Sequence, residues 1–169
     1  CIRDSSYFQQ KDNLDLIYED PHNFTLNSSS FKAGERIAEM GACINCHFYG
    51  AEKPKQDALT WAPNLVLTKE RLRPEWLVEW FINPQDVMPG TKMPAPYIPT
   101  EEPQNSIREV WGSDVAKISR DSTKLYKSLI DWMWGMEGRK DVSSIVKRHL
   151  NSQGYGFIIE EEDDWGDEW

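Results

Sequence analysis

Three residues close together in the chain have the types and spacing to hold a cofactor covalently. Cys43, Cys46 and His47 form the pattern C-x-x-C-H within the sequence CINCH. Two thiols three positions apart can each form a thioether bond to one of the two vinyl groups of a haem. The adjacent histidine is then held under the iron as its proximal ligand. The pattern predicts a site for one covalently bound haem c.

Two other chemistries compete for the same residues. A structural zinc site needs four ligands, usually as two separated pairs, but the other candidates stand alone in the sequence: Cys1, His22 and His149. A thioredoxin-like dithiol needs a strand before the motif and a helix after it, and no such setting is evident. Both interpretations are weaker than haem attachment.

An electron-transfer haem needs a sixth iron ligand, commonly a methionine thioether. The segment 83–94, NPQDVMPGTKMP, offers two methionines, Met88 and Met93. Met93 has a proline on each side, at 89 and 94, and Gly90 permits a tight turn, so a short loop can hold its neutral sulfur. A Met93 packed in the core is the alternative, and Met88 is the alternative ligand.

The order of three motifs resembles class I cytochromes c: CINCH, then APNL at 62–65, then PGTKMP at 89–94. The resemblance covers about residues 30–138. It implies that Cys43 and Cys46 carry the thioether links and that His47 and Met93 are the two axial ligands of the iron.

The same resemblance implies roles for residues around the haem. The backbone carbonyl of Pro63 is expected to accept a hydrogen bond from the His47 imidazole. Donors such as Trp76, Arg71 and Arg73 are expected to bond the haem propionates, as in related cytochromes. Core packing for the tryptophan and solvent exposure for the arginines are the alternatives.

Helices must position these motifs. The resemblance implies an all-α class I cytochrome c fold, with three to four helices around a covalently bound haem. The sequence predicts a helix from Ser30, as N-cap, to about Gly41, and a second from Arg73-Pro74 that stops before Pro84. A third runs from Asp121 to about Met136 and should pack across the first, as the terminal helices of the family do. Residues 141–150 predict a fourth helix.

These elements divide the 169 residues into segments. Residues 1–29 are predicted to form a polar tether, 30–138 the haem domain, and 139–169 a C-terminal extension with an acidic tail. Within the haem domain, 94–120 is an inserted segment; its prolines favour an extended course, with a helical turn at 106–111. Methionines on the apolar face of the predicted helix that starts at Asp121, such as Met133, are expected in the core.

Charge and composition exclude several classes of protein. The formal net charge is −9, and seven acids lie in the tail 160–169, without which the charge would be −2. Such a balance argues against nucleic-acid binding. No run of apolar residues is long enough to span a bilayer. Trp165 and Trp169 could anchor the acidic tail in a partner.

Cys1 has no predicted internal partner, because haem attachment uses the other two cysteines. A cysteine at the first position matches mature bacterial lipoproteins, so lipidation at Cys1 and a place in the periplasm or on the outer face of the cytoplasmic membrane are expected. An artificial chain end or a free thiol is the alternative.

The expected function is electron transfer, as a membrane-anchored subunit of a respiratory or photosynthetic complex whose other subunits are the redox partners. This layout is similar to that of the lipoprotein monohaem cytochrome subunits of alternative complex III. Two alternatives stay open. One is a haem enzyme or gas sensor with a labile sixth ligand, for which His149 is the unassigned candidate on the distal side. The other is a structural subunit whose haem is not redox-active in turnover.

Overall fold

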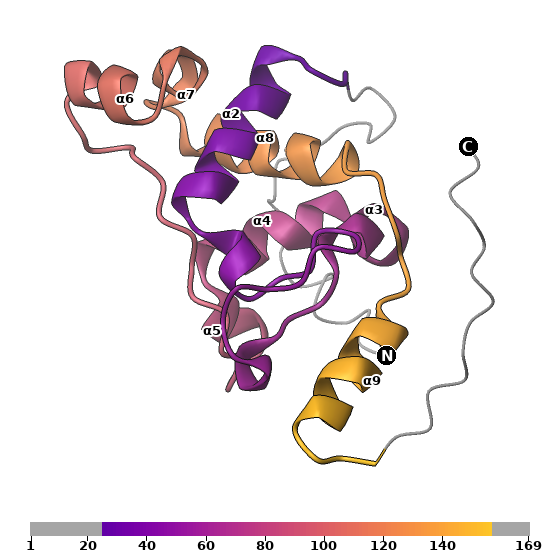
Figure 1. Cartoon of the computed structure of the whole chain (residues 1–169). Coiled ribbons are helices and arrows are strands. Elements are labelled where there is room, and N and C mark those ends of the chain that lie inside the picture. Colours follow the sequence, from indigo (N-terminus) through magenta and orange to yellow (C-terminus); the bar gives the residue numbers. More distant parts are fainter. Residues whose placement is uncertain (1–24, 157–169) are drawn as a thin grey trace. The chain divides into compact units, whose positions relative to one another are not determined.

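The computed structural model describes residues 25–156, and within this range the protein is all-α (Figure 1). The α-helices are α2 (Ser29–Met40), α3 (Thr68–Arg71), α4 (Pro74–Ile82), α5 (Pro84–Val87), α6 (Gln104–Val110), α7 (Ser113–Ile118), α8 (Ser122–Trp134) and α9 (Ser143–Ser152). Short 3₁₀ helices occupy Cys43–Asn45, Ala58–Thr60 and Leu65–Leu67. None of the helices in the described range has the length and apolar character needed to cross a bilayer.

The described residues form two compact units that alternate along the chain. The first unit comprises 25–43 and 68–136, and the second comprises 44–67 and 137–156. Residues 44–67, inside the predicted haem domain, therefore group with the beginning of the predicted C-terminal extension.

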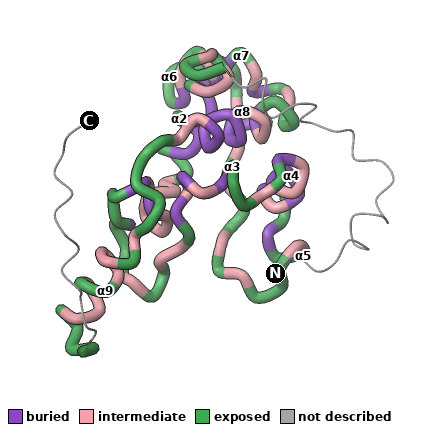
Figure 2. The backbone as a smooth tube through the Cα atoms, turned by 90° about the vertical axis from the view of Figure 1, so that its right-hand side faces the viewer, coloured by how far each residue is buried: buried purple, intermediate pink, exposed green. Residues whose placement is uncertain are grey.

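The first unit is built on the packing of α2 against α8. Figure 2 shows buried stretches in both helices, and the buried residues include Ile37 in α2 and Leu125 and Leu129 in α8. Gly34 lies at the closest approach: a Cβ added there would lie 1.8 Å from the carbonyl oxygen of Ser128. The prediction that the Asp121 helix packs across the first helix is therefore confirmed.

The N-cap of α2 lies two residues before the predicted one. The cap is Ser28, whose hydroxyl accepts a hydrogen bond from the backbone N–H of Phe31 at 3.1 Å. Ser30, the predicted cap, is inside the helix and donates to the Asp131 carboxylate of α8 at 2.5 Å. Three consecutive serines each offer a capping hydroxyl, so the sequence alone does not choose among them. Gly41 ends the helix as predicted.

The second predicted helix is confirmed as α4, which has Pro74 as its first residue. Helix α4 ends at Ile82, before Pro84, as predicted. Pro84 opens the short helix α5, because proline fits the first turn of a helix as well as it ends the preceding one.

The inserted segment is more helical than expected. Its proline-rich half has no regular structure up to Pro103, but α6 and α7 follow instead of one turn at 106–111. Ile107 and Val115 are fully buried, and α7 packs against both α2 and α8. The predicted helical turn at 106–111 overlaps α6, whereas the prediction of an extended course is wrong for α7, whose apolar side chains help to complete the core of the first unit.

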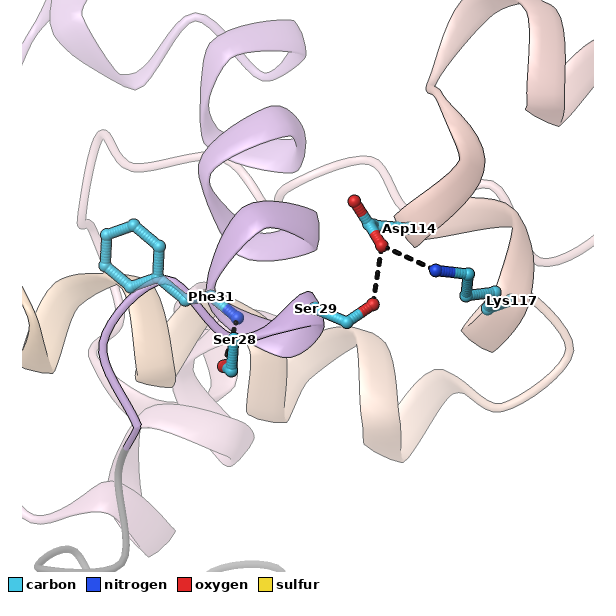
Figure 3. Close-up of polar contacts among 5 residues, drawn as sticks. All are labelled: Ser28, Ser29, Phe31, Asp114 and Lys117. Carbon is cyan, nitrogen blue, oxygen red and sulfur yellow. Dashed lines mark hydrogen bonds and ion pairs between the residues drawn. The ribbon is translucent and has the colours of Figure 1, made fainter.

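A polar contact fixes the start of α2 to α7 (Figure 3). Ser29 donates to the Asp114 carboxylate at 2.6 Å, and Lys117 of α7 donates to the same oxygen at 2.9 Å. These bonds lower the pKa of Asp114 below its ordinary value. The ionised carboxylate therefore contributes to holding the two helices together.

The last two predicted helices are confirmed with small shifts. Asp121 caps α8 by accepting from the backbone N–H of Lys124, and Met133 is buried, as expected for a core methionine. Helix α9 begins at Ser143, whose backbone N–H donates to the Asp141 carboxylate at 2.8 Å. No residue of α9 is fully buried.

Candidate functional site

The C-x-x-C-H motif begins where α2 ends. After Gly41, Ala42 adopts a left-handed conformation (φ 53°), and Cys43 starts the 3₁₀ helix. Cys43 and Cys46 are both thiols and both partly exposed. The thiol of Cys46 donates to the side-chain oxygen of Gln56 at 3.4 Å. Neither cysteine is therefore part of the fully buried core.

His47 has one ring nitrogen held by the backbone. Its Nδ1 lies 2.8 Å from the carbonyl oxygen of Pro63. Since a carbonyl only accepts, Nδ1 carries the proton, and Nε2 is the ring nitrogen that can bind a metal. Burial lowers the pKa of His47 below its ordinary value, although the bond to Pro63 acts in the opposite direction. The lowered pKa favours the neutral imidazole, the form required of a metal ligand.

Backbone pairing fixes the Pro63 carbonyl opposite the histidine. Residue 47 forms an isolated parallel bridge with Ala62. The N–H of Ala62 donates to the carbonyl of Cys46 at 2.7 Å, and the N–H of Leu65 donates to the carbonyl of Phe48 at 3.0 Å. The segment after the motif is therefore held alongside the APNL segment on both sides of the His47–Pro63 contact.

The sulfur of Met93 accepts a hydrogen bond. The indole N–H of Trp80, in α4, donates to the Met93 sulfur at 2.7 Å. Trp76 stacks on Trp80 with ring centroids 5.0 Å apart. A thioether sulfur has two lone pairs, so one remains for a metal. Met88 differs in its surroundings, because it is 54% exposed, whereas Met93 is partly buried.

The loop that carries Met93 is pinned by Gln85, a residue that no sequence motif singles out. Gln85 of α5 donates from its side-chain amide to the carbonyl of Thr91 and accepts from the N–H of Gly90. Gly90 has a φ of 87°, a backbone conformation that residues with a side chain rarely adopt. The Thr91 hydroxyl accepts from the N–H of Met93. Helix α5 therefore helps to hold the Met93 loop in place, in addition to the two prolines.

The remaining predicted site residues lie in both units. Arg71 ends α3 and Arg73 is the residue before α4, and both are exposed. Trp76 is partly buried and stacked on Trp80. His149, on α9, contacts the ring of Trp61 at a centroid distance of 4.7 Å.

The structure brings these residues together in two groups, each within one unit. In the second unit His47 meets Pro63, and Cys46 lies one residue before the histidine. In the first unit Met93 meets Trp80, on which Trp76 stacks. Cys43 is the last residue of the first unit before the chain enters the second. Cys1, His22, Trp165 and Trp169 lie outside the described residues.

The two groups fit the chemistry of haem c attachment. They supply two thiols for thioether bonds, a neutral imidazole with its proton fixed on Nδ1, and a thioether sulfur with an available lone pair. Within the described range, no three His, Cys, Asp or Glu side chains gather as a cluster that could hold a metal ion.

Comparison of the chain with protein-family models, with curated proteins and with solved structures finds no match.

Proposed function

We propose that the protein transfers electrons through a single haem c, as a class I cytochrome c. Cys43 and Cys46 would carry the thioether bonds, and His47 and Met93 would be the axial ligands. The observation that carries the proposal is the hydrogen bond between His47 Nδ1 and the Pro63 carbonyl, because it joins the C-x-x-C-H motif to the APNL motif in the tautomer that a ligand needs.

The haem would supply a one-electron couple between ferric and ferrous iron. The protein's part is to fix the ligands and to set their donor strength. Pro63 orients the imidazole ring of His47 and increases its basicity. Trp80 orients the side chain of Met93 and holds its sulfur at a set position.

The redox partners would be other protein subunits of a membrane complex on the outer side of the cytoplasmic membrane. The tail 160–169 supports this part of the proposal, because it combines seven acids with two tryptophans. Aromatic anchors of this kind are enriched where proteins bind one another. Alternative complex III is one assembly with a subunit of similar layout.

Visible absorption spectra of the oxidised and reduced protein, with carbon monoxide added to the reduced sample, test the proposal. We expect a low-spin c-type spectrum that carbon monoxide does not change, because both axial positions are filled. A spectrum that shifts with the gas would instead favour a haem enzyme or a sensor. A chain that acquires no haem under conditions that mature other c-type cytochromes would overturn the proposal.

Two methionine variants identify the sixth ligand. Met93→Ala should open the iron to carbon monoxide and lower the reduction potential, since a thioether stabilises ferrous iron. Met88→Ala is the matched control, because it removes an exposed methionine five positions earlier in the chain. If Met88→Ala opens the iron and Met93→Ala does not, the ligand assignment is wrong.

A further inference from the structure

Asn64 uses both polar atoms of its side chain to bond backbone groups of the second unit. Its Oδ1 accepts from the backbone N–H groups of Gly50 (3.0 Å) and Val66 (3.3 Å). Its Nδ2 donates to the backbone carbonyls of Arg139 (2.9 Å) and Lys140 (3.2 Å). Asn64 is 5% exposed, so these bonds are made away from water.

The segments that Asn64 joins also touch through two glycines. Gly50 and Gly138 both have positive φ angles, 61° and 137°. A Cβ added at Gly50 would lie 3.3 Å from the backbone nitrogen of Arg139 and 3.6 Å from the Cα of Gly138. This approach lets the backbone carbonyls of 139 and 140 reach the Asn64 amide. We call these residues the Asn64 clamp: Gly50, Asn64, Gly138, Arg139 and Lys140.

The clamp acts on the peptide group that holds the histidine. The Pro63 carbonyl and the backbone N–H of Asn64 belong to one planar peptide unit. Fixing the Asn64 side chain to residues 139 and 140 therefore limits rotation of the carbonyl that lies 2.8 Å from His47 Nδ1. Residues 139 and 140 lie 75 and 76 positions along the chain from Asn64.

We propose that Asn64 is a positioning residue, which, with residues 138–140, holds the Pro63 carbonyl on His47 and so sets the donor strength of the proximal ligand. This inference rests on the proposed function, because donor strength matters only if His47 binds the haem iron. It assigns a role to the start of the C-terminal extension, for which the family resemblance implies none.

A purely structural role for Asn64 makes a different prediction. In that case, loss of the amide would destabilise the second unit but leave the His47–Pro63 bond of the folded protein unchanged. In a positioning role, the bond would lengthen or become dynamic. The imidazole would then be a weaker donor, ferric iron would be less stabilised, and the reduction potential would rise.

The experiment compares the holoproteins of Asn64→Ala, Gly138→Ala and the wild type by redox titration. Asn64→Ala removes the amide, and Gly138→Ala strains the other side of the clamp without changing the APNL segment. Asn105→Ala, at an exposed position of α6, is the control for the first variant. Gly154→Ala is the control for the second, because Gly154 has a φ of 92° and no atom within 4 Å of an added Cβ.

We expect the reduction potential of both clamp variants to rise. The rise should correspond to about a three- to tenfold change in the ferric-to-ferrous equilibrium, where a tenfold change is about 59 mV for one electron. Both controls should keep the wild-type potential. Amide hydrogen exchange gives a readout that does not use the haem: the N–H groups of Gly50 and Val66 should exchange faster in Asn64→Ala, because they lose their acceptor.

The outcomes separate the clamp from the proposed function. Faster exchange and a lower melting temperature with an unchanged potential would show that Asn64 is only structural, and would overturn the inference. If Asn64→Ala yields no folded holoprotein, the potential of Gly138→Ala decides the question alone. A wild-type chain without haem would overturn the proposed function while leaving the exchange result to test the contacts of Asn64.

Discussion

The contact between α2 and α8 predicts that Gly34→Ala destabilises the first unit. Alanine is favoured over glycine inside a helix by about 1 kcal/mol, so an isolated α2 would gain from the change. In the folded protein the new Cβ would lie 1.8 Å from the Ser128 oxygen and 2.9 Å from the Cβ of Trp132. Since real Cβ contacts begin near 3.0 Å, α2 and α8 would have to separate locally by about 1.2 Å.

That separation affects the core on both sides of the glycine. Ala33, Ile37, Leu125 and Leu129 are all at most 3% exposed in this region. A gap of about 1 Å forfeits up to about half of the dispersion energy of a contact. Overpacking a core commonly costs about 1–3 kcal/mol, and this overlap involves backbone that cannot rotate away. We expect a net loss of about 2 kcal/mol or more, which is about 4–8 °C in melting temperature for a chain of this size.

Urea denaturation followed by far-ultraviolet circular dichroism measures the effect. Glu35→Ala is the matched control, because it places alanine at the next position of α2, where the side chain is exposed. Its free energy of unfolding should stay within about 0.5 kcal/mol of the wild type. If Gly34→Ala is as stable as the wild type or more stable, helix propensity outweighs packing and the close approach of α2 to α8 is refuted.

Three further variants test single contacts. Ser28→Ala should lower the free energy of unfolding by about 1 kcal/mol in a urea titration, because it removes the cap of α2; no loss would refute the cap. Asp114→Asn should cost less than about 1 kcal/mol at pH 7, since the contact is near the surface. The Asp114 pKa is lowered, so its contribution is present above pH 3.8 and is lost as pH falls through the lowered pKa; a difference from wild type that persists in stronger acid would contradict this. Trp80→Phe should lower the reduction potential, because the Met93 sulfur regains electron density when the indole N–H is removed; an unchanged potential would refute that bond in the holoprotein.

Local patterns predict the helices well where a single residue type decides the boundary. Pro74 fits only the first turn of a helix and Asp121 is a strong N-cap, and the structure begins α4 and α8 at these places. The cap of α2 is harder to predict, because adjacent serines give the same local signal at each position. The inserted segment misleads for another reason: its prolines favour an extended chain, whereas the apolar residues of α6 and α7 form helices as part of the tertiary core.

The contacts that would tune the site cannot be predicted in the same way. The sequence identifies the motifs, but Trp80 and Met93 lie 13 positions apart, and Asn64 and Lys140 lie 76 positions apart. The sequence between them does not indicate which indole will bond to which sulfur, or which backbone carbonyls will accept hydrogen bonds from the Asn64 amide. Such pairs depend on how the elements pack. The types of the proposed ligands are therefore readable from the sequence, whereas their hydrogen-bond partners outside the family motifs are not.

The two hydrogen bonds at the proposed ligands should affect the reduction potential with opposite sign. The Pro63 carbonyl accepts from His47, which would strengthen the imidazole as a donor and stabilise ferric iron in the proposed holoprotein. The Trp80 indole donates to Met93, which would withdraw electron density from the sulfur and favour ferrous iron in the proposed holoprotein. The potential of the wild type would therefore reflect a balance between them.

A double variant tests this balance. Asn64→Ala should raise the potential and Trp80→Phe should lower it, and the two substitutions lie in different compact units without a shared hydrogen-bond partner among the contacts described above. Effects of independent sites add, so the double variant should return toward the wild-type potential. Redox titration of the four proteins measures both the single shifts and their sum. If both single variants shift the potential in the same direction, the opposed action of the two bonds is wrong, because loss of structure around the haem would then explain both shifts.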